Sequence, residues 1–213
     1  MKKDGCMLVG LCGRSGAGKG YVSGIFAELG IPAVDTDKVY RDMTAPSPEL
    51  SVCMKALVDR FGPEAASADH SLNRAVMRKL VFSGDKQALE DLNRITHAFI
   101  LEETNRIAAE LYESGSDIVL IDAPLLFESR FNEMCECVVC VTAPEETLLR
   151  RIIRRDGLGE EDAKKRLAVQ KTAADLEDRS DFVISNDSEY EIMADRVKDC
   201  AQKLRLIREE RYR

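Results

Sequence analysis

A glycine-rich segment near the start of the chain constrains the fold more than any other feature. Residues 13–19 read Gly-Arg-Ser-Gly-Ala-Gly-Lys, which fits the pattern G-x-x-x-x-G-K. The segment follows the apolar run Met7–Cys12 and precedes residues 21–29, whose apolar positions have helical spacing. A strand, a loop of this kind and a helix in this order are typical of a phosphate-binding loop, or P-loop. The sequence therefore predicts a nucleotide-binding α/β protein.

The loop also predicts a set of nucleotide contacts. Its glycines allow consecutive backbone N–H groups to turn toward an anion, and the start of the following helix adds a positive dipole. Lys19 adds a mobile charge for the β- and γ-phosphates. The alternative interpretation is a glycine-rich turn with a surface lysine. The candidate nucleotide-binding residues are Arg14, Ser15, Gly16, Ala17, Gly18, Lys19, Gly20 and Tyr21.

One position departs from the usual P-loop. The residue after the lysine is commonly Ser or Thr, whose hydroxyl binds Mg²⁺, but here it is Gly20. Glycine supplies no ligand and costs a helix about 1 kcal/mol relative to alanine. Nucleotide binding therefore follows more firmly from the sequence than phosphoryl transfer does.

Four further segments have the composition of strands: 32–35, 117–122, Cys137–Thr142 and, more weakly, 181–185. All but the last are nearly continuous in apolar residues, which is typical of strands covered on both faces. Helical patterns separate them, for example at 144–155 and Tyr190–Arg211. Strands that alternate with helices predict a parallel sheet with right-handed crossovers. The predicted fold class is α/β, in the form of a three-layer P-loop NTPase fold.

The chain is predicted to be a single P-loop domain, 1–213, with two special segments. Residues 46–116 have helical spacing at 50–61, 72–82, 86–94 and 97–112 and no convincing strand, which predicts an inserted helical subdomain. Residues 145–175 are predicted to form a helical lid. The end of the chain, from Arg205 on, is highly charged and is expected to fray.

Composition excludes several classes of protein. The formal net charge is −7, whereas a nucleic-acid-binding domain normally carries a basic face, so we expect no nucleic-acid partner. Asp122 and Pro124 interrupt the longest apolar run, 118–127, so we expect no membrane partner. Seven cysteines, an odd number without a secretory signal, indicate reduced thiols and a cytoplasmic location.

Carboxylates follow two of the predicted strands. In an open α/β sheet, ligands bind at the carboxyl ends of the strands, so these side chains are expected beside the P-loop. Asp35 and Asp37 end the second strand, and either can orient and deprotonate an acceptor hydroxyl, although one of them can instead cap the helix expected from Lys38. Asp122 is a candidate for indirect metal binding, with a structural turn aspartate as the alternative.

Four arginines crowd the helix after the fourth strand. Arg150 stacks over Arg154 and Arg151 over Arg155, and such like-charge pairs destabilise a helix unless an anion relieves them. Nucleotide phosphates would do so, whereas pairing with acidic residues such as Glu145 is the alternative for at least two of the four. Glycines at 157 and 159 follow directly, as in a closing lid, and Arg166 and Gln170 are expected to form its far wall.

Several blocks of the sequence resemble, in the same order, those of dephospho-CoA kinases. Residues 10–19 look like the opening of these enzymes, and Val34-Asp35-Thr36-Asp37 is similar to their D-A-D segment. Further similar blocks are Leu72-Asn73-Arg74 with Val81-Phe82, His97, Pro124-Leu125-Leu126-Phe127-Glu128, the lid from Arg151 to Gln170, and residues 181–186. The resemblance covers nearly the whole chain, and the P-L-L-F-E and D-x-D blocks beside a P-loop make it fairly specific.

The resemblance implies transfer of the γ-phosphate of ATP to the ribose 3′-hydroxyl of dephospho-CoA, the last step of CoA synthesis, with Mg²⁺. It implies a P-loop kinase core with a helical CoA-side domain and a lid, in a monomer or weak homo-oligomer. By position, Asp37 is the implied base, Lys19 the phosphate clamp and Arg155 a catalytic lid group. The other implied contacts are Arg151 and Asn186 for the nucleotide, and Asp35, Arg74, His97, Pro124, Leu125 and Arg166 for the acceptor.

The sequence also departs from that family. Gly20 and Tyr21 replace the usual Ser-Thr pair, Cys12 replaces a common Thr, and Ala98 replaces the proline after the histidine. Ser185 stands in place of an aspartate, and alanines at 173 and 174 replace a Glu-Lys pair. Two alternatives therefore stay open: a P-loop kinase of another small alcohol or nucleoside monophosphate, and a catalytically weak nucleotide-binding sensor or scaffold, which Gly20 favours.

Overall fold

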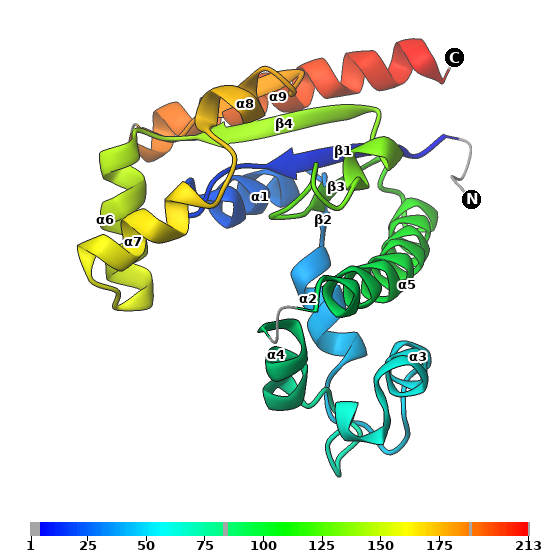
Figure 1. Cartoon of the computed structure of the whole chain (residues 1–213). Coiled ribbons are helices and arrows are strands. Elements are labelled where there is room, and N and C mark those ends of the chain that lie inside the picture. Colours follow the sequence, from blue (N-terminus) through cyan, green and yellow to red (C-terminus); the bar gives the residue numbers. More distant parts are fainter. Residues whose placement is uncertain (1–4, 83–84, 188, 213) are drawn as a thin grey trace. The chain divides into compact units, whose positions relative to one another are not determined.

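The computed structural model describes residues 5–82, 85–187 and 189–212. The chain divides into two compact units (Figure 1). Unit 1 comprises the residues up to Asp35 and those from Ile107 onward, and unit 2 comprises Thr36–Arg106. Each unit has its own interior and is described by itself.

Unit 1 is built on a parallel sheet, as the apolar runs predicted. The strands of its described part are β1 (Met7–Cys12), β2 (Ala33–Asp35), β3 (Ile118–Asp122), β4 (Cys137–Thr142) and β5 (Phe182–Ser185). Their order across the sheet is β2-β3-β1-β4-β5, and every pairing is parallel. The loop after the central strand β1 therefore emerges between the carboxyl ends of its neighbours β3 and β4.

Helices cover both faces of this sheet. The helices of unit 1 are α1 (Lys19–Glu28), α6 (Glu145–Asp156), α7 (Glu160–Ala168), α8 (Ala173–Glu177) and α9 (Tyr190–Arg211), with a short 3₁₀ helix, η2 (Phe131–Met134). Phe26 of α1 and Val197 of α9 pack in one cluster with Val9 and Leu11 of β1. Gly10, of opposite parity on the strand, faces Leu126 in the segment after β3. Alternate residues of β1 are therefore buried on opposite sides, as expected for the middle of three layers.

The predicted fraying of the C-terminal end is wrong. Helix α9 continues to Arg211, and its last turns are bonded to unit 1. Arg208 pairs with Asp117 at 3.0 Å, and the Tyr212 hydroxyl donates to the Cys6 carbonyl at 3.3 Å. These long-range contacts outweigh the charge-rich composition on which the prediction depended.

Unit 2 is helical. It contains α2 (Thr36–Met43), α3 (Val52–Phe61), the 3₁₀ helix η1 (Pro63–Ala65), α4 (Arg74–Phe82) and most of α5 (Lys86–Glu113). Its core is formed by residues such as Met54, Leu57 and Met77. The separate helices predicted at 86–94 and 97–112 are in fact one helix, α5. Thr96, at the predicted break, is accommodated inside the helix because its buried hydroxyl finds a partner in the Leu92 carbonyl, to which it donates at 2.8 Å.

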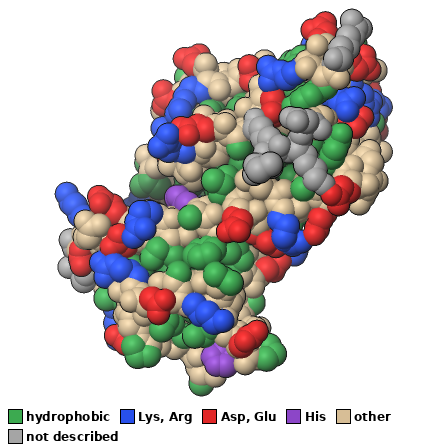
Figure 2. All heavy atoms as spheres, turned by 90° about the vertical axis from the view of Figure 1, so that its right-hand side faces the viewer, with side chains coloured by type: hydrophobic (Ala, Val, Ile, Leu, Met, Phe, Trp, Pro, Cys, Tyr) green, Lys and Arg blue, Asp and Glu red, His purple; other side chains and the backbone are tan. Residues whose placement is uncertain are grey.

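Two surface properties bear on function. Within the described ranges, no helix combines the length and the apolar character that a membrane crossing requires. On the face drawn in Figure 2, basic and acidic side chains are interspersed.

All seven cysteines lie in the described ranges and are free thiols.

Candidate functional site

The glycine-rich loop joins β1 to α1 in a conformation that requires glycine. Gly16 has φ 84° and Gly18 has φ 92°, in the left-handed region that other residues rarely adopt. A Cβ at Gly18 would lie 2.1 Å from Asn186 Nδ2. Gly18 is also the N-cap of α1, and no side chain of the described part caps this helix end. The first N–H groups of α1 therefore remain available to an anion.

Two residues from distant parts of the chain donate hydrogen bonds to the backbone carbonyls of the loop. Asn186, which follows β5 and is 6% exposed, donates from Nδ2 to the Ala17 carbonyl at 2.7 Å. Arg151 of α6 donates to the Gly16 carbonyl at 3.2 Å and to the Asn186 carbonyl at 3.1 Å. Because these bonds fix the loop's carbonyl groups on one side, the N–H groups of the same peptides face the other way. The sequence placed Arg151 and Asn186 among the nucleotide contacts, and in the structure they support the nucleotide-binding loop.

We expect Gly18→Ala to destabilise the loop. Alanine at this φ costs about 1–2 kcal/mol, and the clash with Asn186 adds to that cost. A total loss of about 1–3 kcal/mol in the free energy of unfolding is expected, measured by urea denaturation. Gly20→Ala is the matched control, because a Cβ there has no described atom within 4 Å beyond its own neighbours. The prediction fails if both variants lose the same stability.

The segment that was predicted to be a lid, residues 145–175, contacts the loop at its outer residues. Arg14 pairs with Glu145 at the start of α6 at 3.3 Å and donates to the Leu167 carbonyl of α7 at 3.0 Å. The Ser15 backbone N–H donates to Gln170 Oε1 at 2.9 Å. Residues of α6, of α7 and of the segment after α7 are therefore bonded to the P-loop within unit 1.

Two of the candidate lid arginines share one carboxylate. Asp156 accepts from Arg155 at 2.8 Å and from Arg166 at 2.8 Å, and Arg155 also donates to Ser15 Oγ at 3.2 Å. Hydrogen bonding from Arg155, and then the charges of Arg155 and Arg166, hold the pKa of Asp156 below its usual value. Sequence reasoning missed Asp156, although its position directly after Arg155 was a usable signal. Both guanidinium groups are thus fixed close to the phosphate loop.

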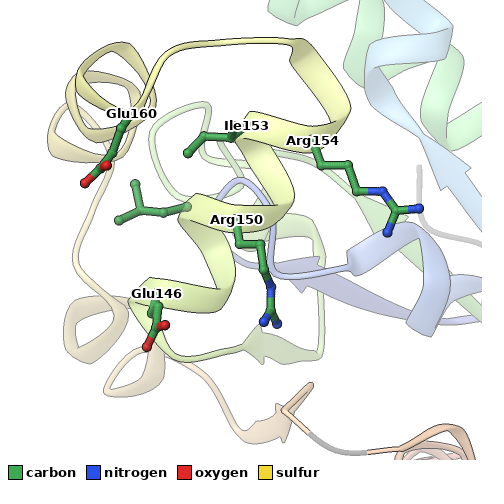
Figure 3. A pocket seen from close by; sticks show the side chains of 6 residues that line it. Glu146, Arg150, Ile153, Arg154 and Glu160 are labelled. Carbon is green, nitrogen blue, oxygen red and sulfur yellow. The ribbon is translucent and has the colours of Figure 1, made fainter.

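Arg150 and Arg154 have a different setting from the other two arginines of α6. They line a hollow of about 470 Å³ together with Glu146, Leu149, Ile153 and Glu160. Figure 3 shows them on successive turns of the helix, each extending away from Ile153. The two predicted pairs of stacked arginines therefore have different surroundings. Arg151 and Arg155 contact the P-loop, whereas Arg150 and Arg154 line the hollow.

Carboxylates meet the P-loop lysine at the edge of the sheet. The register pairs Asp35 with Asp122, and Asp122 with Leu11, so the ends of β2, β3 and β1 lie side by side. Lys19 Nζ is 3.8 Å from Asp122 Oδ1, and both side chains are largely buried, at 17% and 18% exposure. This edge thus combines a cation with oxygen ligands beside the free N–H groups of α1.

The remaining candidates are placed as follows. Pro124 and Leu125 follow β3 in unit 1, and Leu125 is 55% exposed. Asp37, Arg74 and His97 belong to unit 2. Asp37 lies in the first turn of α2, which begins at Thr36 and not at Lys38 as expected, directly after Asp35. Arg74 begins α4, and His97 is a half-buried residue of α5 whose pKa is lowered by burial.

Comparison with known proteins adds independent information. Residues 7–191 match the family model of dephospho-CoA kinase. A dephospho-CoA kinase of Syntrophotalea carbinolica is 38% identical over 192 residues, which cover 90% of this chain and 89% of that protein.

Solved structures share the fold. TT1252 from Thermus thermophilus superposes with a TM-score of 0.76 at 24% identity and covers 93% of this chain and 97% of its own. A dephospho-CoA kinase from Campylobacter jejuni superposes with a TM-score of 0.65 at 22% identity, with coverages of 92% and 96%. At these identities, the two structures support the P-loop kinase fold and nothing finer.

Proposed function

Given that this chain belongs to the dephospho-CoA kinase family of ATP-dependent kinases, we propose that it transfers the γ-phosphate of ATP to the ribose 3′-hydroxyl of dephospho-CoA and so forms CoA. One observation of this structure supports the proposal independently of family membership. The P-loop, its lysine and the strand-end carboxylates Asp35 and Asp122 occur together at one edge of one sheet. That combination binds a polyphosphate and leaves acidic oxygens where the phosphate is transferred.

In this proposal, the backbone and Lys19 bind the donor. The N–H groups at the start of α1 donate to the β-phosphate oxygens, because Arg151 and Asn186 hold the loop's carbonyls on the opposite side. Lys19 extends toward Asp122 and meets the γ-phosphate there. Its charge stabilises the negative charge that the phosphate oxygens carry during transfer.

Asp37 is the proposed base toward the acceptor hydroxyl. It follows Asp35 by two residues and lies in the first turn of α2. A carboxylate in that position accepts the 3′-hydroxyl proton as the oxygen attacks phosphorus, and ADP leaves. Asp35, at the strand end itself, is proposed to orient the acceptor.

Arg155 and Arg166 are the proposed lid cations. Their shared partner Asp156 and the bond from Arg155 to Ser15 place both near the loop. We propose that residues 145–175 act as the lid and that these arginines turn from Asp156 to the phosphates when ATP is bound. The helical segment 46–116, with Arg74 and His97, is the proposed acceptor-side subdomain, and Pro124 and Leu125 are proposed to line the acceptor site.

Mg²⁺ fits the residues at this edge. The nearby carboxylates are Asp35 and Asp122, which can bind the ion directly or through its bound waters, and oxygen atoms are the ligands that this ion prefers. The ion would neutralise phosphate charge and orient the β- and γ-phosphates. Gly20 contributes no hydroxyl, and the open space at its Cα leaves room for a water. We place Asp122 as an indirect ligand, since its Oδ1 atom already faces Lys19.

We expect Gly20→Ser to lower the Mg²⁺ concentration that gives half-maximal activity. The added hydroxyl replaces a water in the open space at this position, which is worth about one hydrogen bond, or about 2- to 13-fold in apparent affinity. A Mg²⁺ titration at fixed ATP measures the midpoint for both proteins, with Gly20→Ala as the variant that adds a side chain without oxygen. An unchanged or higher midpoint for the serine variant would show that the hydroxyl is not needed here.

A coupled ADP-release assay tests the function itself. Dephospho-CoA is compared with AMP, CMP, shikimate and gluconate as acceptors, and turnover is expected with dephospho-CoA alone. Turnover of another acceptor would favour a different small-molecule kinase. ATP binding without turnover of any acceptor would favour a nucleotide sensor. We also propose that the protein is cytoplasmic and is a monomer or a weak homo-oligomer.

A further inference from the structure

Two exposed tyrosines contact each other beside the phosphate loop. The rings of Tyr21 and Tyr190 have their centroids 5.8 Å apart and meet edge to face at 65°. Tyr21 is 45% exposed and Tyr190 is 51% exposed, although aromatic side chains of this size are usually more buried. The pair therefore presents aromatic surface to solvent at a defined place.

The position of the two rings depends on the same hydrogen bonds that hold the phosphate loop. Tyr21 lies two residues after Lys19 in the first turn of α1, and its N–H donates to the Gly18 carbonyl at 3.0 Å. Tyr190 begins α9, four residues after Asn186, which is bonded to the loop at Ala17. Each tyrosine therefore lies within four residues, along the chain, of a residue that is hydrogen-bonded to the phosphate loop.

We infer that Tyr21 and Tyr190 form the surface on which the purine base of the nucleotide lies, and that they favour purine over pyrimidine triphosphates. The inference rests on the proposed function, because it requires the triphosphate to be bound at the P-loop. A nucleotide joins a charged phosphate chain to a flat aromatic ring, and this part of unit 1 offers phosphate-binding N–H groups next to aromatic faces. Tyr21 stands where the resembling family commonly has threonine, so the pair is a property of this chain.

The chemistry of the rings suits this role. A purine stacks on an aromatic side chain through its π-face, and the larger purine covers more ring surface than a pyrimidine does. Burial, and then the neighbouring Tyr190, raises the pKa of the Tyr21 phenol above its usual value of 10.0. A tyrosine phenol is already neutral at physiological pH, so the ring does not repel the phosphates.

Binding measurements with two probes separate base contact from phosphate contact. ATP and inorganic tripolyphosphate are titrated into the wild-type protein, Tyr21→Ala and Tyr190→Ala by calorimetry. Each alanine variant is expected to weaken ATP binding by about tenfold, since stacking of one base on one aromatic side chain has that order of effect. Tripolyphosphate binding is expected to stay within about twofold of wild type, because that ligand lacks the base. Tyr190→Phe, which keeps the ring, is expected to bind ATP like the wild type.

Kinetics with four nucleotides provide the second measurement. The ratio of kcat/KM for ATP and GTP to that for CTP and UTP is expected to fall in both alanine variants. Leu206→Ala is the matched control, since Leu206 is an exposed apolar residue elsewhere on α9, at 59% exposure. Equal loss of ATP and tripolyphosphate binding would overturn the inference and make the pair a support of the loop. So would unchanged ATP affinity. Failure of the kinase proposal is distinguishable, because it would appear as absent turnover by the wild-type protein, whereas the calorimetric comparison depends only on ATP binding.

Discussion

Asp37→Asn is expected to lower kcat by about 10²- to 10⁴-fold while ATP affinity stays close to that of the wild type. Asparagine keeps the size and polarity of the side chain but does not accept a proton. The carboxylate acts on the acceptor hydroxyl and not on ATP, so nucleotide binding is unaffected. Steady-state kinetics with dephospho-CoA and an independent measurement of ATP binding together test both parts of this expectation.

Asp35→Asn is the matched control for this prediction. Asp35 ends β2 and pairs in register with Asp122, whereas Asp37 begins the helix that follows. If Asp37→Asn keeps more than about a tenth of the wild-type kcat while Asp35→Asn does not, the assignment within the pair is reversed.

Lys19→Ala is expected to reduce both ATP affinity and turnover. The lysine charge contacts the phosphates in both the ground state and the transition state. Its removal therefore weakens ATP binding and also slows the reaction. A charge-assisted hydrogen bond of this kind is worth about 1.5–3 kcal/mol, which corresponds to at least a tenfold loss of ATP affinity. The variant also leaves the largely buried Asp122 carboxylate without the cation that lies 3.8 Å away.

Lys198→Ala is the control for loss of a lysine as such. Lys198 is a half-exposed residue of α9 that pairs with Asp195, and its removal is expected to change neither quantity. A Lys19→Ala protein that binds ATP normally and fails only in turnover would contradict the assignment of Lys19 to ground-state binding.

The strands and the P-loop could be predicted because their signals are local. Continuous apolar runs such as Met7–Cys12 mark strands covered on both faces, and a G-x-x-x-x-G-K segment has few other uses between a strand and a helix. Helix α5 was less predictable. The pattern near Thr96 weakens in sequence, and the hydrogen bond from its hydroxyl to Leu92 is visible only in the folded helix.

The roles of individual polar residues were the least predictable. Arginines on α6 were predicted to face an anion, and that role stays a prediction; the bonds from Arg151 to loop carbonyls and from Arg155 to Asp156 were not predicted. Asn186 could be recognised from its sequence block, yet its bond to Ala17 spans 169 residues. Contacts of that range depend on the whole tertiary structure and leave no local pattern. Asp37, Arg74 and His97 stay predictions for the acceptor side.

The bond from Asn186 to Ala17 has a consequence for synthesis of the chain. The P-loop is synthesised well before the two residues that bond to its Gly16 and Ala17 carbonyls, Arg151 and Asn186. A nascent chain that ends before β5 therefore has the full G-x-x-x-x-G-K segment and Arg151, but it lacks Asn186 and the bond from Asn186 to Ala17. ATP can then stabilise the chain through the fully held loop only after β5 and Asn186 have been made. Until that point, the nascent protein folds without help from its own substrate.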